Sequence, residues 1–132
     1  MTALLKPTSR TRKVSAVKEE ATRLHSKIVR ATKGPLCNCG CGRLATDAAH
    51  IVGRVFSHTR TDEANALALA AECHRRFTNW PDEWVAFLDS HIGRKEYERL
   101  KRKAQDGVAV KFDWYDELDR LRALAAQLGV AA

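Results

Sequence analysis

The chain has 132 residues, is 45% hydrophobic and carries a formal net charge of +7. This length suits one modest domain with extensions, and the hydrophobic share is enough for a real core. No run of about 18 apolar residues is present, which excludes a membrane span, and the N-terminus has no apolar stretch of the secretory type. We therefore expect a cytoplasmic protein.

The excess positive charge lies at one end of the chain. Residues 1–36 contain nine Lys and Arg but only two acids, whereas residues 37–132 contain 14 of each and sum to zero. A basic segment confined to one end is typical of an arm that binds phosphate groups. The alternative is a solvated tail that only aids solubility. We favour nucleic acid as the partner.

A tail and a long helix are the first elements expected. Residues 1–13 are polar and basic, and are predicted to form a disordered tail. Over residues 14–34, apolar side chains recur every three or four positions, which predicts a basic amphipathic helix. Its apolar face comprises Val14, Val17, Ala21, Leu24 and Ile28. His25 is expected at the surface of this helix, with no role in a site.

Short elements and further helices are expected beyond Gly34-Pro35. Only seven glycines and three prolines occur in the chain, which favours helix over strand. We predict a tight loop, a strand, a loop, a second strand and a helix over residues 36–43, 44–51, 52–64, 66–69 and 70–78. Three more helices are expected over residues 81–92, 94–104 and 113–128, with a turn at Asp106-Gly107. The predicted class is α+β, mostly helical.

The four cysteines indicate a metal site. Three of them crowd into Cys37-Asn38-Cys39-Gly40-Cys41, and the fourth is Cys73. In a reducing compartment, clustered cysteines are more often metal ligands than disulfides. Free thiols or a redox function are the alternatives.

Histidines and an asparagine lie between and beside these cysteines, in an order that suits phosphodiester hydrolysis. A neutral histidine can take a proton from water while a divalent cation offsets the charge on phosphate and leaving group. The two groups must approach the phosphorus from opposite sides. A strand hairpin packed on a helix achieves this, because strand and helix present residues to one cleft from two directions.

This ordered set resembles the HNH endonucleases, also called ββα-metal or His-Me finger nucleases, which are common in bacteriophages. The resemblance covers about residues 37–104 and is carried by Ala49-His50-Ile51-Val52-Gly53-Arg54, Thr59-Arg60-Thr61-Asp62, Asn65-Ala66 and Cys73-His74-Arg75-Arg76-Phe77. It implies a ββα-metal domain over residues 35–105, with a zinc-bound loop. The C-terminal helix, assigned to residues 106–132, lies outside the resemblance. The resemblance also implies a bacterial host cell as the location.

The resemblance assigns roles to individual residues. His50 matches the general base, His74 a ligand of a catalytic Mg²⁺ or Mn²⁺, and Asn65 the asparagine that pins the loop orienting the base. Cys73 matches a ligand of a structural Zn²⁺, together with one or more of Cys37, Cys39 and Cys41. Such a zinc site would fasten the loop before the first strand to the turn before the helix.

Two positions depart from the family pattern. Many members carry an acid or histidine where this chain has Ala49, so one ligand of the catalytic metal is absent. Asp47 is a substitute on the same strand, and His58 is another; alternatively, DNA oxygens and water complete the coordination. Ala70 stands where the family commonly has a further cysteine. The extra cysteine of the Cys37–Cys41 loop would then supply the fourth zinc ligand.

Several cations are expected to contact the DNA backbone, for which the guanidinium group is well suited. These candidates are Arg54, Arg60, Arg75, Arg76, Lys27, Arg30 and Lys33.

The sequence therefore predicts a metal-dependent HNH endonuclease that nicks or cuts duplex DNA. The first alternative is a zinc-containing DNA-binding accessory protein without catalysis, for example in a phage packaging or recombination assembly. A weaker alternative is a redox or zinc-sensing protein.

Overall fold

The computed structural model describes residues 5–132, which form mostly helices and one small antiparallel sheet. The elements in chain order are α1 (Val14–Lys33), β1 (Asp47–His50), α2 (Ser57–Arg60), η1 (Glu63–Asn65), β2 (Ala66–Leu69), α3 (Ala71–Asn79), α4 (Pro81–His91), α5 (Arg94–Gly107) and α6 (Trp114–Leu128). The prediction of a mostly helical α+β protein is confirmed at this level. Among the described residues, no helix is long and apolar enough to cross a membrane.

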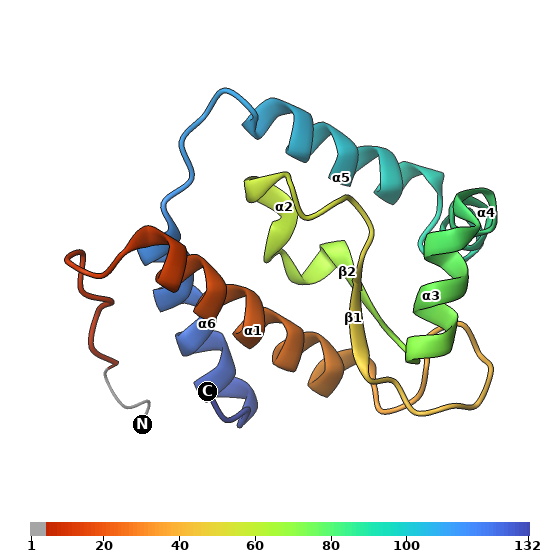
Figure 1. The fold of residues 1–132 in the computed structure, drawn as a ribbon, viewed down its shortest axis with the longest axis horizontal. Coiled ribbons are helices and arrows are strands. Elements are labelled where there is room, and N and C mark those ends of the chain that lie inside the picture. The colour runs from red at the N-terminus through yellow and green to blue at the C-terminus, as the bar shows by residue number, and fades with distance from the viewer. Residues whose placement is uncertain (1–4) are drawn as a thin grey trace.

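Helices α1 and α6 lie side by side although they are far apart in the sequence (Figure 1). Their apolar stripes form one buried cluster, which comprises Val17, Ala21, Leu24, Ile28, Trp114, Leu118, Leu121 and Ala125. Asp113 caps α6 by accepting hydrogen bonds from the backbone amides of Tyr115 and Asp116, which satisfies amides that have no partner within the helix. The predicted basic helix and the C-terminal helix are thus one packing unit.

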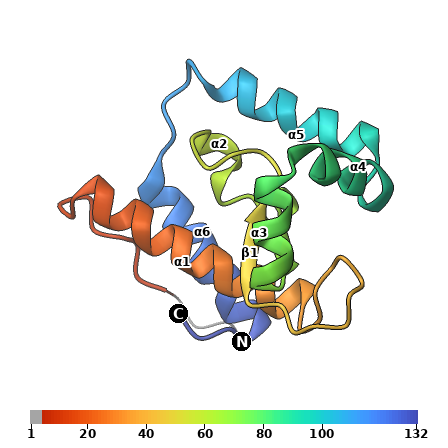
Figure 2. The ribbon, with the colours of Figure 1, turned by 45° about the vertical axis from the view of Figure 1, so that its right-hand side comes forward.

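The hairpin of β1 and β2 lies between this helix pair and α5 (Figures 1 and 2). Its register pairs Asp47 with Leu69 and His50 with Ala66. All four residues of β2 are buried, because α1 covers the sheet on one side. A second apolar cluster, formed by Ile51, Val52, Leu67, Leu88, Leu100 and Ala104, joins the hairpin to α4 and α5. Helix α3 begins two residues after the end of β2, and α2 and η1 lie between the two strands.

Three local predictions differ from the structure. The first strand is shorter than residues 44–51, because Leu44 is 67% exposed and pairs only with Leu36. The segment 52–64 is not an irregular loop, because it contains α2 and η1. The turn at Asp106-Gly107 is wrong, because α5 continues to Gly107. A Cβ at Gly107 would collide with the His58 ring, so the absence of a side chain allows this close approach.

The predicted disordered tail over residues 1–13 is also wrong for its second half; residues 1–4 lie outside the described residues. The backbone amide and hydroxyl of Thr8 donate to Asp119 on α6, at 2.6 and 2.7 Å. Arg10 pairs with Asp113 and Asp116, and Arg12 pairs with Glu20. These arginines therefore anchor the segment to α1 and α6 rather than forming a free basic arm.

Candidate functional site

The four cysteines converge into one cluster. Their Sγ atoms all lie within 4.8 Å of one another; the closest separations are 3.3 Å for Cys37 to Cys39, 3.5 Å for Cys39 to Cys73 and 3.6 Å for Cys41 to Cys73. Ligands about 2.3 Å from a zinc ion at tetrahedral angles have similar mutual spacing. The donor set and its geometry therefore fit a structural metal ion such as zinc.

The Cys37–Cys41 loop is held in shape by its backbone and by Asn38. The amide of Cys37 donates to the Arg43 carbonyl at 2.8 Å, and the backbone amide of Asn38 donates to the Ala68 carbonyl at 2.8 Å. The Asn38 side chain accepts from the Ala68 amide at 2.8 Å. Gly40 has φ of +86°, a conformation that favours glycine. The loop is thereby attached to β2, directly before the helix that carries Cys73.

Arg43 lies beside the cluster and favours the thiolate form of Cys41. Its backbone amide bonds to Cys41 and lowers the pKa of that thiol to about 6. Its guanidinium group reaches Cys41 and Cys73 and also pairs with Glu72 at 3.3 Å. A nearby cation offsets the negative charge of thiolate ligands.

His74 and Asp47 meet between α3 and β1. The Nδ1 atom of His74 donates to Oδ2 of Asp47 at 2.9 Å, and this hydrogen bond lowers the pKa of Asp47. Oδ1 of Asp47 accepts a second hydrogen bond, from the Thr46 hydroxyl at 2.9 Å. The carboxylate therefore fixes the orientation of the His74 ring and leaves Nε2 as the nitrogen that could bind a metal, as carboxylates do for metal-binding histidines.

His50 is held by a backbone carbonyl. Its Nε2 lies 2.8 Å from the Arg60 carbonyl oxygen. Because a carbonyl oxygen only accepts, Nε2 carries the proton and Nδ1 has a free lone pair. Burial lowers the pKa of His50 to about 4. The imidazole is therefore neutral at pH 7, which is the state a general base requires.

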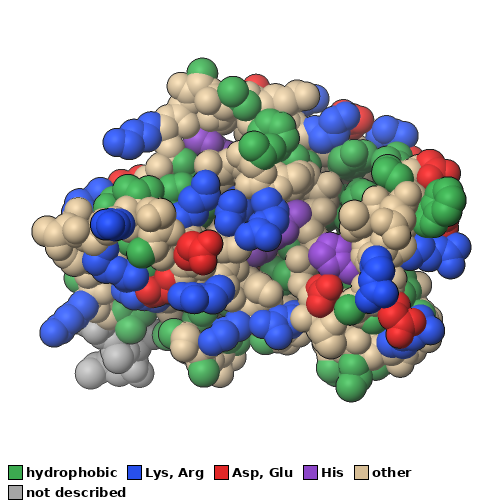
Figure 3. All heavy atoms as spheres, in the orientation of Figure 1, with side chains coloured by type: hydrophobic (Ala, Val, Ile, Leu, Met, Phe, Trp, Pro, Cys, Tyr) green, Lys and Arg blue, Asp and Glu red, His purple; other side chains and the backbone are tan. Residues whose placement is uncertain are grey.

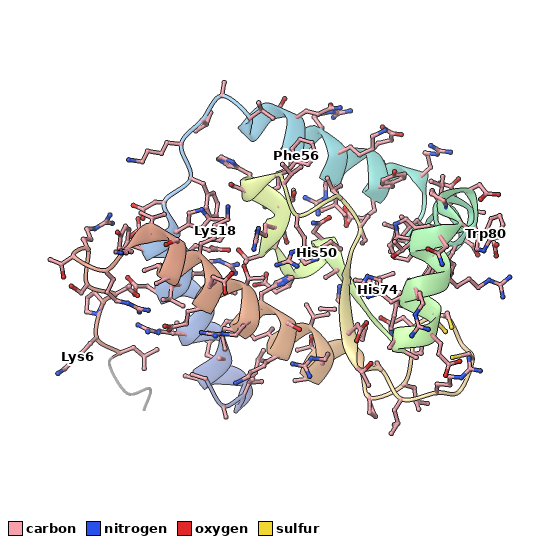
Figure 4. All side chains as sticks on the ribbon, viewed as in Figure 1. Lys6, Lys18, His50, Phe56, His74 and Trp80 are labelled. Atoms are coloured by element: carbon pink, nitrogen blue, oxygen red, sulfur yellow. The ribbon has the colours of Figure 1, made fainter. Side chains whose placement is uncertain are left out.

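His50 and His74 line the same small pocket. It has a volume of about 90 Å³ and is bounded by Ala49, His50, His74, Phe77, Thr78 and Trp84. Figure 4 shows both imidazoles beside β1. The predicted base and the predicted metal ligand are thus brought together, although they are 24 positions apart in the chain. His58, the other substitute considered for Ala49, lies elsewhere, with its ring edge-on to Phe112 at 5.0 Å.

Asn65 is fully buried and fastens the segment between the strands. Its Oδ1 accepts from the Val52 amide at 2.8 Å, and its Nδ2 donates to the carbonyls of Val52 and Thr59 at 3.0 and 2.9 Å. These contacts fix the segment 52–65, which contains the Arg60 carbonyl that holds His50. They leave no free polar atom on the side chain for a ligand.

Some of the predicted DNA-contacting cations lie near Asp47 and His50. Lys27, Arg30 and Arg54 are exposed; Arg30 is close enough to lower the pKa of Asp47, and Arg54 and Arg60 act similarly on His50. Figure 3 shows Lys and Arg side chains gathered beside histidines on this face. Arg60 is half-buried, with its Nε donating to the Thr22 hydroxyl at 3.0 Å.

The remaining three cations differ in their availability. Arg75 is exposed on α3. Arg76 is exposed but pairs with Glu83 at 2.8 Å. Lys33 is half-buried, and its ammonium donates to the carbonyls of Glu63 and Ala66 at 2.8 and 2.5 Å. The structure does not support Lys33 as a phosphate contact, because its ammonium group already donates hydrogen bonds to those two carbonyls.

Three residues near the site had no predicted role. His25 is completely buried, not at the surface as expected, and its ring centroid lies 5.5 Å from that of His50. Asn38 attaches the cysteine loop to β2, and Arg120 of α6 donates to the Thr61 carbonyl at 3.1 Å. The spacing of His25 from Ala21 and Ile28 was the available signal, because it places His25 near the apolar face of α1.

Comparisons with known proteins add no identification: no family model, curated protein or solved structure matches this chain.

Proposed function

We propose that this protein is a metal-dependent endonuclease of the HNH type, which hydrolyses phosphodiester bonds of DNA. The observation that carries the proposal is the pocket shared by His50 and His74. Each imidazole has one nitrogen fixed, by the Arg60 carbonyl and by Asp47 respectively. Each therefore presents its other nitrogen in a defined orientation.

In this proposal His50 is the general base. Its Nδ1 lone pair takes a proton from the attacking water, while the bond from Nε2 to the Arg60 carbonyl keeps the ring in place. The low pKa of His50 ensures that the ring is neutral before the reaction. The resulting imidazolium stays hydrogen-bonded to the same carbonyl, which favours the charged form.

His74 would hold the catalytic Mg²⁺ or Mn²⁺ through Nε2. A bound divalent cation would neutralise the charge that develops on the phosphate and the leaving oxygen. Asp47 is better supported as the residue that orients His74 than as the sole replacement for a ligand at Ala49, since both of its oxygens already accept hydrogen bonds. Magnesium commonly keeps several waters and uses few protein ligands, so this sparse donor set fits it.

The cysteine cluster would hold a structural Zn²⁺ through Cys37, Cys39, Cys41 and Cys73. Its effect on the site is indirect but close, because Cys73 directly precedes His74 on α3. The ion would attach the first turn of α3 to the loop that is bonded to β2. The positions of His74 on α3 and Asp47 on β1 would then be fixed relative to each other.

Plasmid cleavage tests the enzymatic proposal. Protein of known zinc content should nick supercoiled plasmid in Mg²⁺ or Mn²⁺, and chelation of these ions should stop the reaction. His50→Ala and His74→Ala should lose activity by at least about 100-fold, as expected for a base or a metal ligand. His91→Ala is the matched control, since His91 is exposed on α4. Intact plasmid across a range of salt and pH would contradict the proposal.

A second candidate function is a DNA-binding accessory protein without catalysis, for example in a phage packaging or recombination assembly. Ala49 favours it, because this residue is buried beside His50 and offers no metal ligand. A gel shift that persists in His50→Ala, together with no nicking by the parent protein, would select this function. Nicking that depends on His50 would exclude it.

A further inference from the structure

Four consecutive backbone carbonyls before η1 each accept a hydrogen bond from a different side chain. The donors come from η1, β1, α6 and α1, which are brought together only by the fold. The pairs are Asn65 to Thr59 at 2.9 Å, His50 to Arg60 at 2.8 Å, Arg120 to Thr61 at 3.1 Å and His25 to Asp62 at 3.0 Å. We call residues 59–62 the carbonyl row. It fixes the segment whose Arg60 carbonyl holds His50.

His25 is the unexpected donor in this set. It is completely buried in α1, beside an otherwise apolar helix face. Its Nε2 must donate, because the Asp62 carbonyl only accepts, and its Nδ1 has no partner within the described residues. A buried polar atom without a partner costs free energy. An apolar side chain here would avoid that cost but would lose the hydrogen bond to the Asp62 carbonyl.

The environment of His25 keeps it neutral. Burial is the largest influence and lowers its pKa; the charged groups that act on it are Asp62, Glu117 and Lys33. The Asp62 carboxylate is itself paired with Lys103 at 2.5 Å. The His25 ring therefore lies against His50, at 5.5 Å between centroids, without placing a positive charge beside it.

We propose that His25 is a positioning residue for His50. By holding the Asp62 carbonyl and packing against the His50 ring, it keeps the Arg60 carbonyl where it selects the Nε2–H tautomer of His50 and leaves Nδ1 free. This inference rests on the proposed role of His50 as the base. It extends the site to α1, so that the helix bearing the basic surface also sets the geometry of the reaction.

Three substitutions at one position test the inference. His25→Gln keeps a donor at the reach of Nε2, because the terminal amide nitrogen of glutamine lies about as far along the side chain. His25→Asn is also an amide but is too short to reach the Asp62 carbonyl. His25→Leu fills the space without a donor. Both variants place a polar amide at this buried position, so a difference between His25→Gln and His25→Asn reports the effect of the hydrogen bond to the Asp62 carbonyl.

The first readout is the ¹⁵N spectrum of the imidazoles, which reports the tautomer of His50 whether or not the protein cleaves DNA. We expect the Nε2–H tautomer in the parent and in His25→Gln, and a mixture of tautomers in His25→Asn and His25→Leu. Parent-like His50 spectra in a folded Asn or Leu variant would overturn the inference. If neither of these variants folds, His25→Gln decides: a parent-like tautomer supports the inference and a mixture overturns it.

The second readout is plasmid cleavage. The Asn and Leu variants should lose on the order of 10-fold in kcat with KM unchanged, since His25 is buried and touches no substrate, and His25→Gln should recover most of the loss. An unchanged kcat in a folded Asn variant would overturn the inference. If the parent does not cleave DNA, the proposed function fails, but the tautomer measurement still tests His25.

Discussion

Asn65 and the histidines show how much single side chains contribute to this site. Asn65 makes three hydrogen bonds without any exposure to solvent, and it joins the end of the hairpin to the carbonyl row. His50 and His25 donate to two other carbonyls of that row. These polar side chains therefore hold the backbone of the carbonyl row in place.

Replacement of Asn65 by alanine should therefore be strongly destabilising. Asn65→Ala leaves the Val52 amide and two carbonyls without their partner in a buried place, and each such group costs about 1–3 kcal/mol. We expect the free energy of unfolding in urea to fall by about 2–4 kcal/mol. Asn79→Ala, at an exposed position at the end of α3, is the control and should change it little. Equal effects of the two substitutions would contradict this assignment.

His50 should not titrate near neutral pH. Burial lowers its pKa to about 4, whereas an ordinary histidine has a pKa of 6.5. Its Cε1–H chemical shift should therefore stay constant from pH 8 to about 5.5. The unfolded chain takes up its proton first, so the stability contributed by neutral His50 is complete above pH 6.5 and is lost as the pH falls toward 4. A titration midpoint near 6.5 would contradict the buried position of the ring.

At the scale of elements, the cysteine loop supports a sheet that is too small to be stable alone. The sheet has only two strands of four residues, which are marginal alone. The loop bonds to β2 through Asn38 and approaches α3 through Cys73. A metal ion in the cluster would therefore connect the loop, the hairpin and the helix.

Removal of one cysteine should release the metal and loosen this connection. We expect one zinc per parent chain and little in Cys73→Ser, with a free energy of unfolding lower by several kcal/mol. Metal analysis, thiol titration and denaturation would measure these changes. Glu72→Gln is the neighbouring control, because it removes only an exposed ion pair with Arg43, which contributes little. Parent protein without zinc and with four reactive thiols would contradict the structural metal site.

At the scale of the whole molecule, several cations of the basic N-terminal segment are paired within the protein and are not free at its surface. Arg10, Arg12 and Lys33 belong to the basic first quarter, yet acids or carbonyls of the protein hold them. Lys27 and Arg30 remain exposed on α1, on the helix that also carries His25. The surface available to phosphate is therefore a smaller part of the +7 segment than the sequence indicates.

DNA binding should depend on these α1 cations more than on total charge. Lys27→Gln/Arg30→Gln should weaken binding and lower the slope of log K against log salt by about 1.8, because each phosphate that a cation neutralises contributes about 0.9 to the slope. Lys95→Gln/Arg102→Gln removes the same charges from exposed positions on α5 and should leave the slope nearly unchanged. Affinity measured at several salt concentrations distinguishes the two pairs. Equal reductions in affinity would mean that binding follows net charge alone.

The predictable features were those encoded within a few neighbouring residues. The apolar spacing of α1 and α6, the end of α1 at Gly34-Pro35 and the crowding of three cysteines are local patterns, and the structure agrees with them. The helical turns in residues 52–64 escaped prediction because they are short and are held by long-range contacts, such as that of Thr61 with Glu117. The tail was misjudged because most of the acids that hold it lie more than 100 residues away, at the start of α6 and within it: Asp113, Asp116 and Asp119.

By itself, the sequence determined the longer helices and the chemical groups that are available: a basic helix, a cysteine cluster, two histidines and an asparagine. The tertiary structure decided which of these groups meet. It paired Asp47 with His74, placed His50 against the Arg60 carbonyl and buried His25 beneath it. The physical reason is that orientation, tautomer and pKa depend on hydrogen-bond partners and burial, and these partners come from elements that are distant in the chain.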